Sequence, residues 1–219
     1  MIFNHVKVKE FEKLEQVTLP NGARHYVTPE GKKYPSVTTI LGAQSKQGII
    51  EWRKRVGEEE ANKISRAATS RGTKLHTHVE NYLNNVNATE PMSMFQRELF
   101  DSVLEHLHRI NNIHLQEERL YSDHLRLAGT VDCIGEFDGK LAVIDFKTAS
   151  RRKEKEWIHS YFMQCAAYAI MYEERTGIPI SKLVVLIAVE GDSPQVFIEK
   201  RDNWVADLLK CRDSYENGQ

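Results

Sequence analysis

The segment 128–150 reads AGTVDCIGEFDGKLAVIDFKTAS and constrains the fold more than any other stretch of the chain. Two largely apolar runs flank the dipeptide Asp138-Gly139, which is a strong signal for a two-residue hairpin turn. Both runs have the length and the β-branched residues of strands. The segment therefore predicts two paired strands, at about 126–137 and 140–147.

The first half of the chain is mainly helical in pattern, after an initial hairpin. The hairpin is expected over 15–28, around Pro20-Asn21-Gly22. Helix start and stop signals then predict a short helix from Ser36 to Gly42, helical segments from about 48 to 84 with boundaries at Gly57 and Gly72, and an amphipathic helix at about 93–112.

The second half has the order β-β-β-α-β-β-α. Besides the hairpin strands, the pattern predicts strands at about 114–122, 182–190 and 195–199, a helix at about 156–175 that ends at Gly177, and a C-terminal helix from about 202. This order is typical of an α/β domain with a mixed sheet and one crossover helix. We expect one compact domain, with an N-terminal hairpin and helical region over 1–112 and a core over 113–219.

Composition excludes several classes of protein. With 30 Lys and Arg against 31 Asp and Glu, the net charge of −1 gives no global attraction to nucleic acid, so any such site must be a local basic patch. No apolar run approaches the roughly 20 residues of a membrane helix, and no signal or transit peptide is recognisable. The 3 cysteines exclude a Cys-only zinc site and argue against a disulfide framework. We expect a cytoplasmic protein without a membrane partner.

Charged side chains converge on the predicted hairpin. Asp145 and Lys147 are two apart on one strand and leave the same face, and Asp132 lies on the strand folded back beside it. The run LAVIDF does not bury a carboxylate without a partner, because an unpaired buried charge is very costly. Mg²⁺ is one such partner. The alternative is a structural Asp–Lys pair, since a bare D-x-K triplet occurs often by chance.

Two helices carry polar interruptions that flank these carboxylates. His76 and Glu80 lie at i and i+4, and so share a helix face. Gln164 and Tyr168 have the same spacing within an otherwise apolar stripe. Taken singly, such residues are usually solvated or satisfied in a core. Their position on the helices before and after the sheet favours one shared site.

The order H-x-x-x-E, G-T-V-D, I-D-F-K-T, Q-x-x-x-Y resembles the PD-(D/E)XK superfamily, in its RecB-like nuclease branch. Within that branch YPSVTTIL at 34–41, EWRKRVG at 51–57 and RGTKLH at 71–76 are similar to the mitochondrial genome-maintenance exonuclease and its phage and bacterial relatives. The resemblance covers roughly residues 20–200. It implies a restriction-endonuclease-like α/β core, a mixed sheet flanked by helices, with a helical N-terminal region that arches over the active site.

The resemblance also implies roles for individual residues. His76, Asp132 and Asp145 would be metal ligands, together with the main-chain carbonyl of Phe146, and Glu80 is an additional candidate. Lys147 would be the catalytic lysine, and Gln164 and Tyr168 would position the lysine or the scissile strand. One or two Mg²⁺ or Mn²⁺ ions would be the cofactor. Because the cysteines are not clustered, we expect no iron–sulfur cluster, and without a transit peptide we expect a bacterial or phage-encoded protein.

Two basic segments are candidate DNA contacts. Residues 147–155 carry five basic residues and one acidic residue directly after the catalytic strand, and 46–74 carry eight basic and four acidic residues around Trp52. The alternatives are a solvated loop for the first and a core tryptophan for the second. The predicted DNA-binding residues are Ser36, Thr38, Trp52, Arg53, Arg71, Arg151, Arg152 and Lys153.

The leading hypothesis is a Mg²⁺- or Mn²⁺-dependent deoxyribonuclease, a phosphodiester hydrolase that acts on single-stranded DNA ends or flaps as a monomer. The resemblance places such an activity in DNA repair, recombination or replication. One alternative is a structure-specific endonuclease of the same fold. A second is a non-catalytic DNA-binding recombination accessory module, which would be expected to have lost one of the charged residues. A third is an α/β scaffold with incidental ion pairs.

Overall fold

The computed structural model describes residues 1–86 and 91–218. Its centre is a five-stranded sheet in the order β4-β5-β6-β7-β8. The strands are β4 (Ile110–Ser122), β5 (Leu127–Phe137), β6 (Lys140–Ala149), β7 (Lys182–Val189) and β8 (Gln195–Lys200). Only β6 and β7 pair in parallel, and helix α4 (His159–Thr176) makes the crossover between them. The predicted mixed sheet with one crossover helix is confirmed.

The hairpin between β5 and β6 forms as the sequence predicts. Asp138 and Gly139 have φ angles of 51° and 69°, the left-handed conformation that a tight turn of this kind requires. The register pairs Cys133 with Ile144, which brings Asp132 alongside Asp145 on neighbouring strands. The local turn thereby sets the relative position of the two carboxylates.

Both faces of the sheet are covered. On one face Val131, Val143 and Leu183 pack with α4 and with the C-terminal helix α5 (Asp202–Asn217). On the other face Ile144 and Leu186 pack with residues of α2 (Glu58–Leu83) and α3 (Met94–Leu107). Because β6 and β7 are buried on both faces, they are apolar almost throughout, as parallel strands in α/β folds are.

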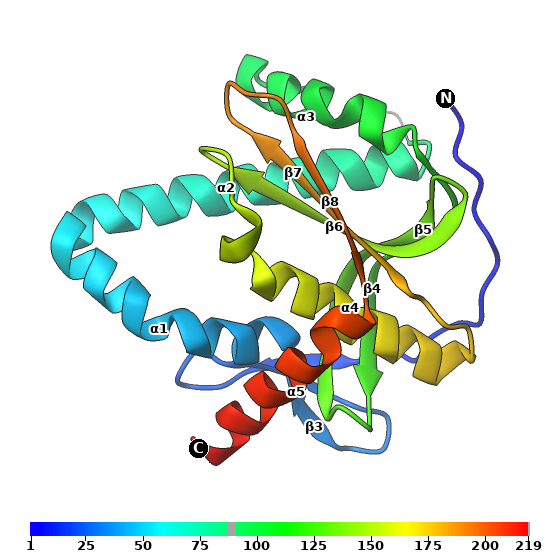
Figure 1. Ribbon diagram of the computed structural model, residues 1–219, viewed down its shortest axis with the longest axis horizontal. Helices are drawn as coiled ribbons and strands as arrows, with labels where there is room; N and C mark the ends of the chain where they lie inside the picture. Colours follow the sequence, from blue (N-terminus) through cyan, green and yellow to red (C-terminus); the bar gives the residue numbers. More distant parts are fainter. Residues whose placement is uncertain (87–90, 219) are drawn as a thin grey trace.

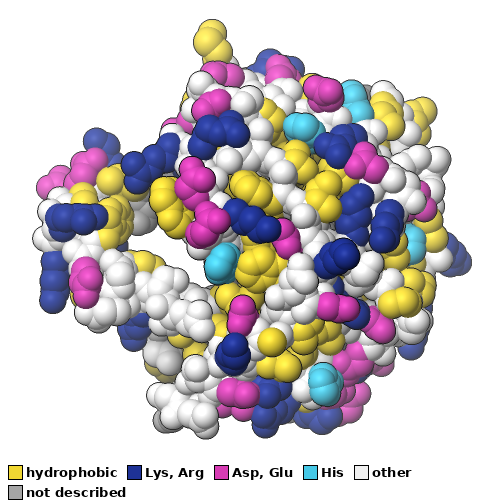
Figure 2. Space-filling view, viewed as in Figure 1, with side chains coloured by type: hydrophobic (Ala, Val, Ile, Leu, Met, Phe, Trp, Pro, Cys, Tyr) yellow, Lys and Arg dark blue, Asp and Glu magenta, His cyan; other side chains and the backbone are white. Residues whose placement is uncertain are grey.

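The long helices α1 (Val37–Val56) and α2 form an arm. They run out from the body and turn back at Gly57, whose φ of 92° ends α1 (Figure 1). Residues 44–70, which we call the arm, are almost all exposed. The space-filling view shows an opening between the arm and the body (Figure 2). The outer parts of α1 and α2 therefore stand away from the sheet and enclose space beside it, whereas the C-terminal part of α2 packs on the sheet.

The predicted helix stop at Gly42 and the boundary at Gly72 are wrong. Gly42 lies inside α1 and Gly72 inside α2. A helix interior tolerates a glycine at about 1 kcal/mol relative to alanine, and only a change of backbone conformation ends the helix. Gly57 has that change, with positive φ, whereas neither Gly42 nor Gly72 does.

Other boundaries differ by a few residues. Helix α3 ends at Leu107 rather than near 112, because Ile110 already pairs with Phe137 at the start of β4. The predicted helix from 156 begins instead as a short 3₁₀ turn, η1 (Lys155–Trp157), and α4 follows from His159. Its end at Gly177, with φ of 74°, is confirmed.

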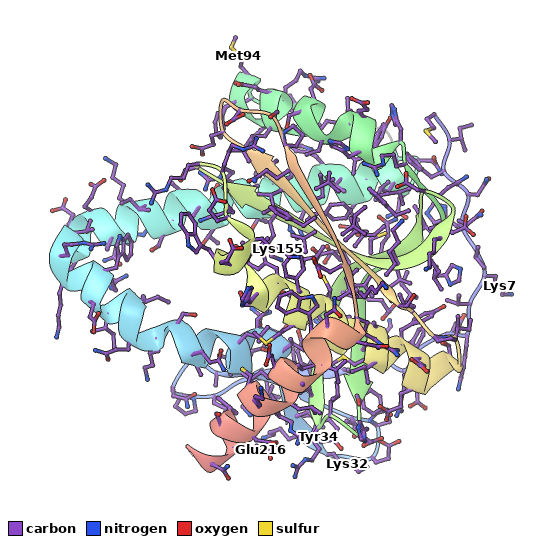
Figure 3. The ribbon with its side chains drawn as sticks, in the orientation of Figure 1. Lys7, Lys32, Tyr34, Met94, Lys155 and Glu216 are labelled. Carbon is purple, nitrogen blue, oxygen red and sulfur yellow. The ribbon has the colours of Figure 1, made fainter. Side chains whose placement is uncertain are left out.

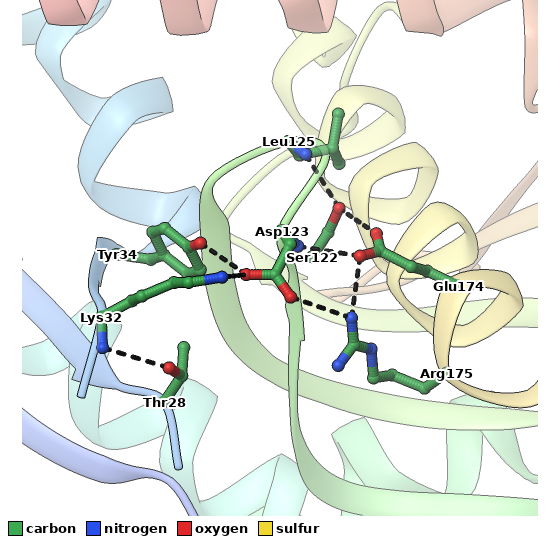
Figure 4. Close-up of polar contacts among 8 residues, drawn as sticks. All are labelled: Thr28, Lys32, Tyr34, Ser122, Asp123, Leu125, Glu174 and Arg175. Atoms are coloured by element: carbon green, nitrogen blue, oxygen red, sulfur yellow. Dashed lines mark hydrogen bonds and ion pairs between the residues drawn. The ribbon is translucent and has the colours of Figure 1, made fainter. Parts of the chain in front are cut away.

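A small N-terminal sheet of β1 (Glu15–Thr18), β2 (Arg24–Val27) and β3 (Lys33–Pro35) is joined to the body through Asp123. The carboxylate of Asp123 accepts hydrogen bonds from Lys32 at 2.7 Å, from Tyr34 at 2.6 Å and from Arg175 at 3.3 Å (Figure 4). These contacts connect β3 and the turn after β4 with α4.

None of the helices described is long and apolar enough to cross a membrane.

Candidate active site

Helix α2 and strand β6 meet at the predicted metal ligands. The Nε2 of His76 lies 2.7 Å from the carbonyl oxygen of Phe146. The backbone N–H of Phe146 donates to Asp132 Oδ2 at 2.9 Å. Asp132 Oδ1 lies 3.8 Å from the other ring nitrogen of His76. The structure therefore brings together a histidine, a carboxylate and a main-chain carbonyl from α2, β5 and β6.

Asp145 and Lys147 form a pair on the same face of β6. Asp145 is 2% exposed, and the Lys147 ammonium lies 2.6 Å from its carboxylate. Burial, together with the charge of Asp132, raises the pKa of Asp145, and Lys147 opposes that rise. Burial alone would lower the pKa of Lys147, but the two aspartates outweigh it and keep the lysine charged. The aromatic ring of Tyr161, in the first turn of α4, lies 5.2 Å from the same ammonium.

Glu117 is a site residue that the sequence reasoning missed. It lies on β4 between Gln116, which pairs with Cys133, and Glu118, which pairs with Val131, so it is opposite Asp132. Its carboxylate is 3.6 Å from His76 Nδ1. Its φ of 47° is uncommon for a residue other than glycine and is a form of backbone strain often found at functional sites. The register of predicted strands 114–122 and 126–137 was the signal that could have found it.

The acidic neighbours of His76 control its protonation. Burial disfavours the charged imidazolium, but Glu117 and Asp132 outweigh that effect and raise the pKa of His76 to about 9. Glu80, one turn along α2, also belongs to this neighbourhood, because burial and the charge of Glu117 raise its pKa. In the absence of a cation, a proton on His76 therefore offsets part of the negative charge of the site.

Gln164 and Tyr168 lie on α4, which covers the face of the sheet toward which Asp132 and Asp145 point. Gln164 is buried, and burial together with the two aspartate charges raises the pKa of Tyr168 far above its usual range. Tyr168 packs directly on Gly129, where an added Cβ would lie 2.7 Å from the tyrosine hydroxyl oxygen. The glycine of the G-T-V-D motif thus makes room for the tyrosine of the Q-x-x-x-Y motif.

The donor set suits a hard divalent cation. Ligand atoms of His76, Glu117 and Asp132 lie within 4.8 Å of one another. Asp145 Oδ2 is buried and lies 2.6 Å from the Lys147 ammonium, and it accepts no aligned hydrogen bond within the described residues. A carboxylate has more acceptor positions than one ammonium occupies, so Asp145 also fits a metal ligand beside these donors. Carboxylate and carbonyl oxygens with one imidazole fit Mg²⁺ or Mn²⁺.

The predicted DNA-binding residues are spread over the start of α1, the arm, α2 just beyond the arm, and the segment after β6. Ser36 is buried and caps α1 by accepting a hydrogen bond from the Thr39 N–H at 3.0 Å, while Thr38 beside it is exposed. Trp52 is half-buried on the arm. Thr38 and Trp52 therefore offer more accessible surface than Ser36, whose observed contact is the helix cap.

Several of the predicted basic contacts are engaged in ion pairs. Arg53 bridges the corner of the arm to Glu58, and Arg71 pairs with Glu190. Arg152 hydrogen-bonds Ser193 in the turn after β7. Arg151 is exposed and Lys153 half-buried. Arg53 lies on the arm, Arg71 follows it in α2, and the other three lie directly after β6. Their role in binding DNA stays a prediction.

A mixed sheet that presents Asp132, Asp145 and Lys147 from adjacent strands, with a histidine from a preceding helix, defines a class of nuclease. Residues 49–203 match the sequence profile of the PD-(D/E)XK nuclease superfamily, and the chain belongs to that superfamily. The predicted family and fold are confirmed.

Among curated proteins, the chain is similar to mitochondrial genome maintenance exonuclease 1. It is 25% identical to the human protein over 175 residues and 28% identical to the Xenopus tropicalis protein over 176 residues, each covering 73% of this chain and 50% of the relative. The chain thus spans about half the length of these relatives. A crystal structure of a proposed exonuclease from Eubacterium rectale aligns with a TM-score of 0.47 at 12% identity, over 67% of this chain and 64% of that one.

Proposed function

We propose that this protein is a Mg²⁺- or Mn²⁺-dependent deoxyribonuclease that hydrolyses single-stranded DNA from free ends or flaps. The observation that carries the proposal is the convergence of His76, Asp132, Asp145 and the Phe146 carbonyl beside Lys147. These groups come from α2, β5 and β6, and the buried carboxylate of Asp145 faces the Lys147 ammonium at 2.6 Å. Two carboxylates and a lysine held together in a buried position are costly without a ligand to share the charge, which supports a metal site.

In the proposed reaction, His76, Asp132, Asp145 and the Phe146 carbonyl hold the cation, with Glu117 and Glu80 beside them. When bound, a divalent cation polarises the scissile phosphate and makes a water molecule more nucleophilic. Lys147 stabilises the negative charge that develops on the phosphoryl oxygens or orients the attacking water. Gln164 and Tyr168 position the lysine and the strand.

The shape of the arm favours single-stranded DNA with a free end as the proposed substrate. The opening between the arm and the body lies beside the sheet (Figure 2), and a strand enclosed there would have to enter by its end. Residues 46–74 supply eight basic side chains and an aromatic ring, a combination suited to unpaired nucleotides. The curated relatives are themselves named exonucleases.

The test uses linear single-stranded oligonucleotides labelled at the 5′ or 3′ end, together with a circular single strand, in Mg²⁺ or EDTA. We expect Mg²⁺-dependent shortening of the linear strands with the circle intact. Asp145→Asn should abolish the reaction, and Asp207→Asn on the exposed face of α5 is the matched control. A cut circle would indicate an endonuclease instead. Binding without cleavage under any divalent cation would indicate a DNA-binding module.

A further inference from the structure

Trp157 is a large aromatic side chain that the proposed site does not use. It is 68% exposed, although it stands immediately before Ile158, which is 1% exposed. A single exposed apolar side chain is ordinary on a protein surface. Whether the exposed Trp157 has a functional role therefore depends on how firmly the backbone holds its side chain and on which groups lie around it.

The backbone on both sides of Trp157 is held firmly. The side chain of Gln195 accepts a hydrogen bond from the Lys153 N–H at 2.8 Å and donates one to the Lys153 carbonyl at 3.0 Å. Lys155 pairs with Glu199 on β8, and Ile158 is buried in the core. The indole is thus presented to solvent by an anchored segment, not by a loose loop.

The same segment runs between the catalytic strand and the helix that covers it. Trp157 ends η1, which follows β6 and precedes α4. Tyr161, four residues later, places its ring 5.2 Å from the Lys147 ammonium. Lys155, at the start of η1, lies in the middle of the body in this view (Figure 3), and its ammonium pairs with Glu199 on β8. Trp157 therefore lies in the short connection between the strand that carries Lys147 and the first turn of α4, whose Tyr161 contacts that lysine.

The charges around Trp157 suit a nucleic-acid backbone. Residues 151–156 contain four basic residues, Arg151, Arg152, Lys153 and Lys155, and two acidic residues, Glu154 and Glu156. Arg152 and Lys155 hold the segment to the turn after β7 and to β8. The exposed Arg151 makes no hydrogen bond or ion pair with the described residues. An anchored aromatic ring and an available guanidinium in one short segment suit one base and a nearby phosphate of the same strand.

We propose that Trp157 is a stacking platform for one unpaired base of the DNA strand whose scissile phosphate lies at Lys147. The inference rests on the proposed deoxyribonuclease function and specifies how that site selects single strands. A base inside a duplex has both faces covered by its neighbours, so stacking on an indole favours an unpaired base. Trp157 is then a specificity-determining residue and Arg151 a phosphate contact.

The test measures binding of single-stranded 20-mers by fluorescence anisotropy with Mg²⁺, in an Asp145→Asn background that leaves the strand uncut. An abasic site is moved along the strand. We expect one position at which the lost base weakens binding about ten-fold in the parent protein but has no further effect in Trp157→Ala. On the intact strand Trp157→Ala should weaken binding about ten-fold with an unchanged salt dependence, Trp157→Phe should largely restore it, and Arg151→Ala should reduce the salt dependence.

Phe95→Ala, at an exposed aromatic residue of α3, is the matched control and should bind like the parent. Equal losses at every abasic position in the parent and in Trp157→Ala would overturn the inference, as would unchanged binding by Trp157→Ala. Cleavage by the wild-type chain is measured beside these assays. If wild-type cleaves single strands and no position depends on Trp157, only the stacking inference fails. If wild-type neither binds nor cleaves them, the proposed function fails.

Discussion

The Nε2 of His76 lies 2.7 Å from the carbonyl oxygen of Phe146, although the two residues are 70 positions apart in the chain. The contact joins α2, which forms half of the arm, to the strand that carries Asp145 and Lys147. A change in the tilt of α2 would therefore move both the opening and a proposed metal ligand. The position of the arm and the geometry of the site are mechanically connected.

Lys147→Met should lower cleavage of single-stranded DNA about 100-fold to 1,000-fold, because it removes the charge that the proposed reaction places beside the phosphate. DNA affinity should change far less. The measurement is single-turnover cleavage with saturating enzyme, and Lys200→Met at the end of β8 is the control. Cleavage by Lys147→Met at the wild-type rate would contradict the proposed role of the lysine.

Removing one member of the Asp145–Lys147 pair should be worse for stability than removing both. Lys147→Met leaves a carboxylate that is 2% exposed without its cationic partner, which costs roughly 3 kcal/mol in the free energy of unfolding. The double variant Asp145→Asn/Lys147→Met removes both charges and should recover part of that loss. Urea unfolding in EDTA compares the wild type with Lys147→Met, Asp145→Asn and the double variant. Additive losses in the double variant would show that the pair is not coupled.

Mg²⁺ should stabilise the folded protein. At 100 times its dissociation constant, a cation that binds only the folded state adds about 2.7 kcal/mol to the free energy of unfolding. Glu117→Gln should raise the apparent dissociation constant about ten-fold, because its carboxylate lies beside His76 and Asp132. Thermal unfolding against Mg²⁺ concentration gives both values. The neighbouring Glu118→Gln is the control, and an equal effect of the two variants would exclude Glu117 from the site.

Gly129→Ala should destabilise the protein by about 1–3 kcal/mol and reduce cleavage. The new methyl group would lie 2.7 Å from the hydroxyl oxygen of Tyr168, which is buried, so the tyrosine or the strand has to shift. Gly48→Ala makes the same chemical change inside α1, where no atom lies within 4 Å, and should stabilise the protein by up to about 1 kcal/mol. Denaturant unfolding compares the two variants. The prediction fails if both substitutions shift stability in the same direction.

Stability should fall with acidification partly through Asp123. Hydrogen bonds from Lys32 and Tyr34 lower the pKa of Asp123 to about 2, below its ordinary value of 3.8. A carboxyl with a lower pKa in the folded state adds stability above its unfolded pKa and loses it as the pH falls through the folded value. Because the side chain is 35% exposed, solvent screening limits the contribution to about 1 kcal/mol.

Asp123→Asn should therefore be less stable than wild type at pH 7 and equal to it near pH 2. Urea unfolding across this pH range measures the difference, and Asp207→Asn controls for the change in net charge. A gap between wild type and Asp123→Asn that stays constant down to pH 2 would assign the effect of Asp123 to packing instead of charge.

Local signals predicted much of the fold. Asp138-Gly139 and Gly177 form the turn and the helix end that their residue types favour, because glycine adopts a positive φ at little cost and aspartate does so more readily than most residues. Gly42 and Gly72 have the same residue type but stay helical, because the surrounding helices continue through them. Helix stops predicted from a residue type alone therefore succeed only where the backbone also turns.

The pairing of Asp132 with Asp145 and the shared face of Asp145 and Lys147 follow from the chain's local pattern, since strand alternation and a two-residue turn are local geometry. Three other relationships emerge only in the folded protein: Glu117 joins His76, Gly129 accommodates Tyr168, and α1 and α2 enclose an opening. These relationships join residues from different elements, and their distances depend on how helices and strands pack against one another. Packing of that kind is the sum of many weak contacts across the core, which no single segment of the chain contains.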